Sequence, residues 1–181
     1  MADNLANNIL VHTCCAPCSS YSIDKLIKDN YNPVSFFYNP NIFPKVEYER
    51  RRDELISFAE QKTYRLIIEE SPYEKWLEAV KGLENEPEKG NRCKACFRFR
   101  LKKTAIYAKE NNFDAFTTVL TISPHKDALT INQIGRELQE KYNIRFLEEN
   151  FKKNDGFKKS LEISKEYRLY RQSYCGCEFS K

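Results

Sequence analysis

The sequence contains no apolar run that approaches the roughly 18 residues needed to span a bilayer. Its first eight residues contain neither a basic stretch nor an apolar core, so they do not match a secretory signal peptide. Gly-x-Gly-x-x-Gly and P-loop motifs are missing, and so is the cysteine run of two-cluster ferredoxins, which leaves nicotinamide and ATP sites without sequence support. We therefore expect a cytoplasmic protein that does not bind a membrane.

Histidine is scarce, with only two residues in the chain. His12 sits at the end of a short apolar run, where we expect a packed and hydrogen-bonded side chain. His125 lies in a Ser-Pro-His-Lys loop, where Pro and Ser are typical of irregular structure. We expect an acid or ligand role for His125.

Length and composition favour one globular domain over residues 1–181. The chain has 181 residues, of which 41% are hydrophobic and 31% charged, with a net charge of +4. That net charge is too small to indicate nucleic-acid binding by itself. Lys and Arg nevertheless come in local groups, at residues 50–52, 98–103, 152–153, 158–159 and 168–171. These groups are either solvated helix faces or part of an RNA-binding surface.

Cysteine is abundant, with seven residues in a chain without a secretory signal. An odd number argues against a framework made only of disulfides, and the cytosol keeps structural cysteines reduced. Metal binding or redox chemistry is the better interpretation.

The densest cysteine group follows the first apolar run. Ile9, Leu10 and Val11 predict a buried strand, and Cys14, Cys15 and Cys18 come directly after it. Pro17 favours a helix start at this point. The thiols are therefore placed on a strand-to-helix turn, where open α/β sheets bind their ligands.

Strand and helix patterns alternate along the chain and predict an α/β fold. We expect strands at residues 9–11, 33–38, 64–68, 114–120 and 144–147, with helices between them and a C-terminal helix and tail. This alternation indicates a parallel sheet of about five strands flanked by helices on both faces. The loops after the strands then share one edge, where Cys14, His125 and Lys152 can meet.

Cys93 and Cys96 form a CxxC at a predicted helix start, so both side chains lie on one helix face. Redox dithiols, zinc sites and iron–sulfur sites all use this spacing. With the first group it completes a four-cysteine site, for either an iron–sulfur cluster or a zinc ion. The ligands are Cys14 and either Cys15 or Cys18, together with Cys93 and Cys96.

A third thiol group, Cys175-Gly176-Cys177, stands near the end of the chain. It is either a redox dithiol, part of a second metal site, or a pair of solvent-facing thiols. Exposed free thiols oxidise easily, so we expect these to have a partner.

The chain resembles the cobalamin-independent epoxyqueuosine reductases of the QueH type. Six ordered motifs carry the resemblance, at residues 12–18, 38–42, 47–48, 92–97, 121–126 and 170–177. The resemblance implies a Rossmann-like fold of the HUP type and reduction of the epoxide of epoxyqueuosine in tRNA to queuosine. It places a 4Fe–4S cluster on Cys14, Cys15, Cys93 and Cys96, and treats Cys175 and Cys177 as a redox-active disulfide pair.

The resemblance also implies a second, mononuclear iron, an electron donor, and the tRNA anticodon stem-loop as partner. From the resemblance we expect an acidic residue at the position where this chain has Asn150. With the residues alone, two rivals remain: a zinc-stabilised RNA-binding protein without catalysis, and an iron–sulfur tRNA sulfur-transfer enzyme. The latter normally needs a phosphate loop where this chain has cysteines. We expect Cys175, Cys177 and His125 to be catalytic.

Overall fold

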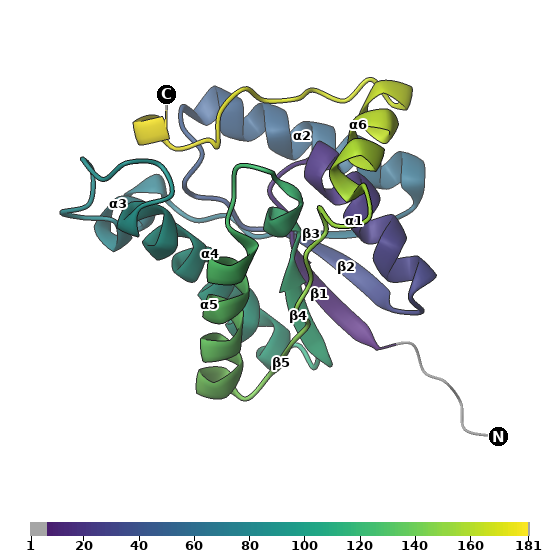
Figure 1. Ribbon diagram of the computed structural model, residues 1–181, viewed down its shortest axis with the longest axis horizontal. Helices are drawn as coiled ribbons and strands as arrows, with labels where there is room; N and C mark the ends of the chain where they lie inside the picture. The colour runs from purple at the N-terminus through teal and green to yellow at the C-terminus, as the bar shows by residue number, and fades with distance from the viewer. Residues whose placement is uncertain (1–6, 181) are drawn as a thin grey trace.

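The computed structural model describes residues 7–180 as a five-stranded parallel sheet between two layers of helices (Figure 1). The strand order is β3-β2-β1-β4-β5, and every neighbouring pair is parallel. The strands are β1 (Asn8–His12), β2 (Asn32–Phe37), β3 (Arg65–Ile68), β4 (Ala115–Thr118) and β5 (Arg145–Phe146). The predicted α/β fold with about five parallel strands is confirmed.

Six α-helices connect and follow the strands. They are α1 (Ala16–Lys28), α2 (Lys45–Lys62), α3 (Tyr73–Ala79), α4 (Asn91–Glu110), α5 (Ala128–Tyr142) and α6 (Gly156–Glu166), with 3-10 turns η1 (Val119–Ile122) and η2 (Glu178–Ser180). Helices α2 and α6 pack against α1 on one face, while α3 and α5 pack against α4 on the other (Figure 1). None of these helices has both the length and the apolarity that a membrane span requires.

The central strand β1 is buried at every residue after its first. Ile9, Leu10 and Val11 have no exposed surface, because β2 and β4 flank this strand in parallel register and helices cover both faces. Such double burial explains its continuous apolar run, which is typical of parallel sheets. Strands β4 and β5 are shorter than predicted: β4 ends at Thr118 and continues as η1, and β5 keeps only two residues.

The C-terminal tail lies across the carboxyl edge of the sheet. After α6 the chain runs alongside α2 and ends beside α3 (Figure 1). Its end is fixed by a hydrogen bond from the Tyr73 hydroxyl to Glu178 (2.6 Å) and by stacking of Phe179 on Trp76, with ring centroids 6.1 Å apart. The sequence therefore returns its last cysteines to the edge where the first ones lie.

Candidate metal and redox site

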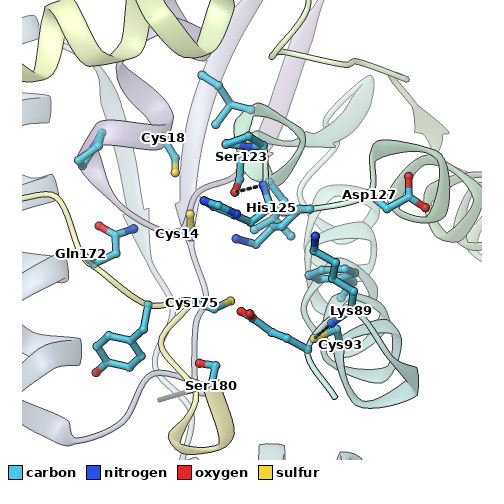
Figure 2. A pocket seen from close by; sticks show the side chains of 18 of the residues that line it. Cys14, Cys18, Lys89, Cys93, Ser123, His125, Asp127, Gln172, Cys175 and Ser180 are labelled. Atoms are coloured by element: carbon cyan, nitrogen blue, oxygen red, sulfur yellow. Dashed lines mark hydrogen bonds between the residues drawn. The ribbon is translucent and has the colours of Figure 1, made fainter. Parts of the chain in front are cut away.

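A cavity of about 620 Å³ opens at the carboxyl edge of the sheet (Figure 2). Its wall is built by the turn after β1, the start of α4, the loop after η1 and the C-terminal tail. Cys14, Cys18, Cys93 and Cys175 all line it, and so does His125. Three cysteine groups that are far apart in the sequence thus share one space.

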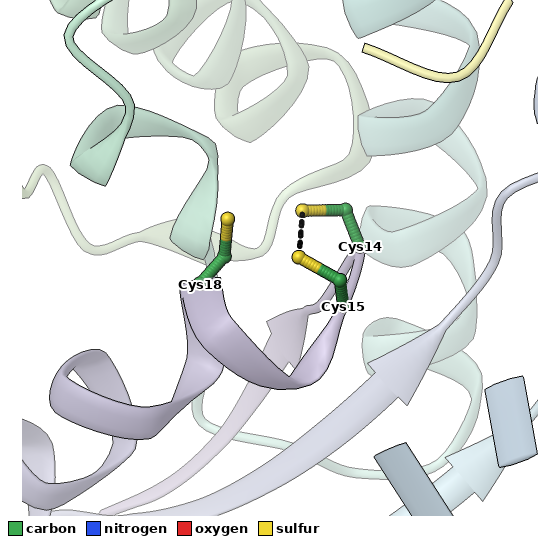
Figure 3. A group of neighbouring side chains, drawn as sticks. All are labelled: Cys14, Cys15 and Cys18. Carbon is green, nitrogen blue, oxygen red and sulfur yellow. Dashed lines mark hydrogen bonds between the residues drawn. The ribbon is translucent and has the colours of Figure 1, made fainter. Parts of the chain in front are cut away.

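The thiols of Cys14, Cys15 and Cys18 form a tight triad (Figure 3). Their sulfurs lie within 4.8 Å of one another, with 3.7 Å between the Sγ atoms of Cys14 and Cys15. Cys15 is the N-cap of α1, so the triad occupies the first turn of that helix. Spacing of this kind suits a shared metal or cluster.

Hydrogen bonds within this triad shift the pKa values of its thiols in opposite directions. The thiols of Cys14 and Cys18 and the Gln172 amide donate toward Cys15 and lower its pKa well below that of a free thiol. The amide Nε2 lies 3.0 Å from the Cys15 Sγ. The pKa of Cys14 is raised to about 12, chiefly by its hydrogen bond with Cys15. Of the three thiols, Cys15 is therefore the one that ionises most readily.

The CxxC and the tail cysteines meet in a second, small cavity of about 20 Å³. Cys93, Cys96, Cys175 and Cys177 all line it. Cys96 and Cys177 are buried among apolar neighbours that include Trp76, whereas Cys93 and Cys175 also face the large cavity. Two thiols therefore connect the two spaces.

Three cations surround Cys175. Burial alone would raise its pKa, but the charges of Lys126, Arg100 and Arg51 lower it. The thiols in turn affect the pKa of Lys126. Burial opposes the charge of Lys126, but Cys175 and Cys14 raise its pKa. The site thus matches negative sulfur with positive side chains rather than with carboxylates, which suits an anionic metal–thiolate group.

The wall of the site also contains polar atoms that lack a partner. Within residues 7–180 these buried atoms include Trp76 Nε1, Arg92 Nε, Arg100 Nη2 and Gln172 Oε1, and all four side chains line one of the two cavities. Buried donors without an acceptor are rare in folded proteins and call for an explanation. A bound group with exposed sulfurs accepts hydrogen bonds from the three N–H donors, Trp76 Nε1, Arg92 Nε and Arg100 Nη2, so these residues fit a metal or iron–sulfur cofactor.

The structure places the two histidines in different surroundings, and the packed, hydrogen-bonded position expected of His12 is confirmed. His12 is fully buried, with Nδ1 3.0 Å from Thr118 Oγ1 and Nε2 3.2 Å from the Tyr38 carbonyl oxygen. Burial lowers its pKa to about 3, with a further contribution from Arg100, so the ring stays neutral. His125 is exposed at the cavity rim (Figure 2). Lys152 lies behind that rim and donates to the carbonyl oxygens of Ser123 (3.1 Å) and Lys126 (2.6 Å).

Sequence analysis missed the role of Arg51. We expected residues 50–52 to belong to a solvated helix face or an RNA-binding surface, but the Arg51 side chain is 1% exposed. Its Nε donates to Glu47 (2.6 Å), and its two terminal nitrogens donate to the carbonyl oxygens of Cys175 (2.9 Å) and Tyr174 (3.2 Å). The spacing of Glu47 and Arg51, one helical turn apart, was the available signal.

Gly176 completes this attachment of the tail. Its φ of +128° lies in the region that favours glycine, and a Cβ there would come within 3.1 Å of both Arg51 Nη1 and Ile42. The carbonyl oxygen of Gly176 accepts from the Phe43 N–H at 2.8 Å. The glycine between the two cysteines therefore allows the guanidinium to approach the backbone.

Replacing Arg51 by Met should destabilise the protein substantially. Glu47 would be left as a nearly buried carboxylate without its cation, and breaking a buried pair in this way costs roughly 3–5 kcal/mol. Arg52→Met is the matched control, since its partners Asp53 and Glu70 are exposed and such pairs contribute at most about 1 kcal/mol. Urea unfolding of both variants measures the difference. Equal unfolding free energies would show that Arg51 does not fix the tail.

Fold and site together define a class: a Rossmann-like α/β protein with a thiol-lined metal or redox site at the carboxyl edge of its sheet. The family model for epoxyqueuosine reductase QueH matches residues 9–181. The chain belongs to this family.

Curated relatives support the assignment across nearly the whole chain. The epoxyqueuosine reductase QueH of Streptococcus pyogenes is 43% identical over 98% of this chain and 72% of its own length. The protein of the same name from Acinetobacter baylyi is 42% identical over 99% of this chain and 83% of its own length. The protein of this name from Thermotoga maritima is 37% identical over 95% of this chain and 89% of its own length.

Solved structures share the fold at low sequence identity. One is a predicted subunit of a tRNA methyltransferase from Methanocaldococcus jannaschii, with a TM-score of 0.58 and 15% identity, over 87% of this chain and 75% of that one. Another is the U34-tRNA thiolase NcsA from Methanococcus maripaludis with its 4Fe–4S cluster, with a TM-score of 0.58 and 16% identity. It matches all of this chain and 64% of that one. These likenesses extend to the fold alone.

Proposed function

We propose that this chain is a single epoxyqueuosine reductase domain that converts epoxyqueuosine in tRNA to queuosine. Family membership at about 40% identity to proteins of that name carries the proposal. The gathering of all three cysteine groups around connected cavities gives it a site. The same relatives disfavour the zinc-only RNA-binding protein and the sulfur-transfer enzyme as alternatives.

For the cofactor we propose a 4Fe–4S cluster held by Cys14, Cys15, Cys93 and Cys96. Cys14 and Cys93 both line the large cavity, each with its predicted partner close by in the sequence. Cys18 belongs to the same triad as Cys14 and Cys15, and is the alternative fourth ligand or a ligand of a second iron. When bound, such a cluster would supply electrons one at a time.

Reduction of an epoxide to an alkene takes two electrons and two protons and releases water. Oxidation of the dithiol Cys175 and Cys177 to a disulfide yields the same two electrons and two protons, so this pair balances one turnover. We propose that the pair works at the wall between the two cavities, where Cys175 is exposed to both. An electron donor must then reduce the disulfide again.

The oxygen of the epoxide needs stabilisation as its carbon–oxygen bond breaks. Lys126 lines the cavity as a protonated amine, because the neighbouring thiols raise its pKa. Its Nζ can donate to the developing alkoxide, which is the usual way in which enzymes stabilise such charge. We assign to the His125 imidazole, on the rim of the same cavity, the delivery of a proton to the leaving oxygen.

An anaerobic assay on tRNA that carries epoxyqueuosine tests the proposed function. Wild-type protein with a chemical reductant should convert the modified nucleoside to queuosine, detected after digestion by the loss of one oxygen in mass spectrometry. A colourless, zinc-containing protein that binds this tRNA without converting it would instead support the non-catalytic alternative.

Recognition of the tRNA should be partly electrostatic and therefore sensitive to salt. Lys89 and Lys94 are exposed at the rim of the large cavity. We expect the affinity for the anticodon stem-loop to fall with salt, and Lys94→Glu to reduce the slope of log K against log salt by about 0.7–0.9 for one lost phosphate contact.

Lys109→Glu provides the matched control for this measurement. Lys109 is an exposed lysine at the far end of α4, about 22 Å from Lys94 along the helix. It should leave the slope unchanged. Identical slopes for Lys94→Glu, Lys109→Glu and wild type would place the RNA away from this rim.

A further inference from the structure

Arg100 is a buried cation that lacks a matching carboxylate. Its residue is 1% exposed, and its hydrogen bonds to the Cys96 carbonyl oxygen and to Asn39 Oδ1 are both 3.4 Å long. Its Nη2 is buried without any hydrogen-bond partner. Within residues 7–180 it takes part in no ion pair. An uncompensated buried charge is costly, so the folded protein needs an anion here.

The negative charges that act most strongly on Arg100 come from sulfur. Although burial opposes its charge, the neighbouring thiols Cys96, Cys175 and Cys14 raise the pKa of Arg100. These thiols come from three segments, and Arg100 lines the large cavity together with Cys14 and Cys175. Four thiolates around a cluster carry an excess of negative charge. They would supply the anion that this buried guanidinium needs.

Trp76, in helix α3, supplies a second donor near Cys96. Its side chain is fully buried, and its indole Nε1 has no hydrogen-bond partner. It lines the small cavity together with Cys96 and Cys177. Cys96 therefore lies beside two buried donors, Arg100 Nη2 and Trp76 Nε1, that lack an acceptor.

We propose that Arg100 and Trp76 are positioning residues for the cluster, which donate hydrogen bonds to its sulfur atoms through Nη2 and Nε1 and thereby raise its reduction potential. The inference rests on the proposed function, since it assumes a cluster with Cys96 as a ligand. Hydrogen bonds to cluster sulfurs and nearby positive charge are established means of setting such potentials. In this chain they would make the cluster easier to reduce by its electron donor.

Anaerobic redox titration of the loaded protein tests this inference, followed by visible absorption and by the EPR signal of the reduced cluster. Arg100→Met removes charge and donors, Arg100→Lys keeps the charge but loses the planar fork, and Trp76→Phe removes only the indole N–H. Arg98→Met is the matched control, because Arg98 lies on the same helix with half of its side chain exposed and pairs with Glu137. Iron and sulfide content are measured for each variant.

We expect the midpoint potential to become more negative in Arg100→Met, less so in Arg100→Lys and Trp76→Phe, and to stay unchanged in Arg98→Met. If Arg100→Met fails to hold its cluster, the shifts in Arg100→Lys and Trp76→Phe decide. If the Arg100 and Trp76 variants hold a full cluster and have the same midpoint potential as the wild type, the inference is overturned. A wild-type protein that holds a cluster but leaves epoxyqueuosine unreduced would contradict the proposed function, while the comparison of potentials would still be valid.

Discussion

Replacing Cys175 or Cys177 by Ser should abolish epoxide reduction while leaving the cluster in place. Both thiols line the small cavity beside the CxxC, and we propose that they carry the two electrons and two protons of a turnover. Loss of either sulfur prevents the disulfide, so turnover should fall by more than about 10³-fold, as when one member of a catalytic unit is removed. Rates of queuosine formation measure the loss, and the visible spectrum reports the cluster.

Ser180→Ala is the control for this pair of variants. Its hydroxyl donates to the Cys177 carbonyl oxygen at 2.8 Å and it lines the same cavities, but it contributes no thiol. It should retain nearly wild-type turnover. Loss of about one iron per chain in the Cys175→Ser and Cys177→Ser variants would make the pair ligands of a second iron instead of a dithiol. Near-wild-type turnover in both would rule out both roles.

Replacing Cys93 or Cys96 by Ser should prevent assembly of the cluster. Each supplies one of four thiolate ligands in the proposed site, and serine replaces a soft sulfur with an oxygen that such clusters bind poorly. We expect iron and sulfide to fall close to zero while helix content, measured by circular dichroism, remains. Turnover should disappear with the metal.

Cys18→Ser separates the two ligand sets that the sequence allows. If Cys15 completes the site, Cys18→Ser should keep iron and sulfide close to the values for a full cubane, and Cys15→Ser should lose them. The low pKa of Cys15 and its hydrogen bond from Gln172 favour this outcome. Full iron and sulfide content in both Cys93→Ser and Cys96→Ser would contradict the four-cysteine site as a whole.

The sequence was sufficient to predict the sheet because parallel strands buried on both faces leave a clear pattern. The continuous apolar run of Ile9, Leu10 and Val11, followed by a helical pattern, is typical of a strand buried on both faces. The outer strand β5 is shorter than its pattern suggested, with two residues. Gly135 of α5 packs against the ring of Phe146, where a Cβ would come within 2.4 Å, and this close contact is invisible in periodicity.

The cysteine groups could be predicted as one site, but their pairing in space could not. Spacing alone linked residues 14–18 with Cys93 and Cys96, whereas the structure also places Cys175 and Cys177 against the CxxC. That arrangement depends on the path of the tail across α2, which is fixed by the buried Arg51. An arginine in a run of three predicts solvent exposure, and only its tertiary partners reveal the opposite.

Arg100 escaped the sequence analysis for the same reason. It lies among three other Lys and Arg residues between positions 98 and 103, all of which suit a solvated helix face. Burial of one member depends on which side of α4 meets the sheet. The same helix face carries Cys96, one turn earlier, so the charge and the thiol are placed together by helical geometry.

A single-turnover experiment tests the central claim most directly. Protein purified without oxygen is reduced, freed of excess reductant, and mixed with tRNA that carries epoxyqueuosine. The account predicts queuosine in proportion to the electrons stored in protein that contains iron and sulfide, and none with the same protein after the metal has been removed. Equal conversion by the metal-free protein, or no conversion by protein with a full and reduced cluster, would contradict it.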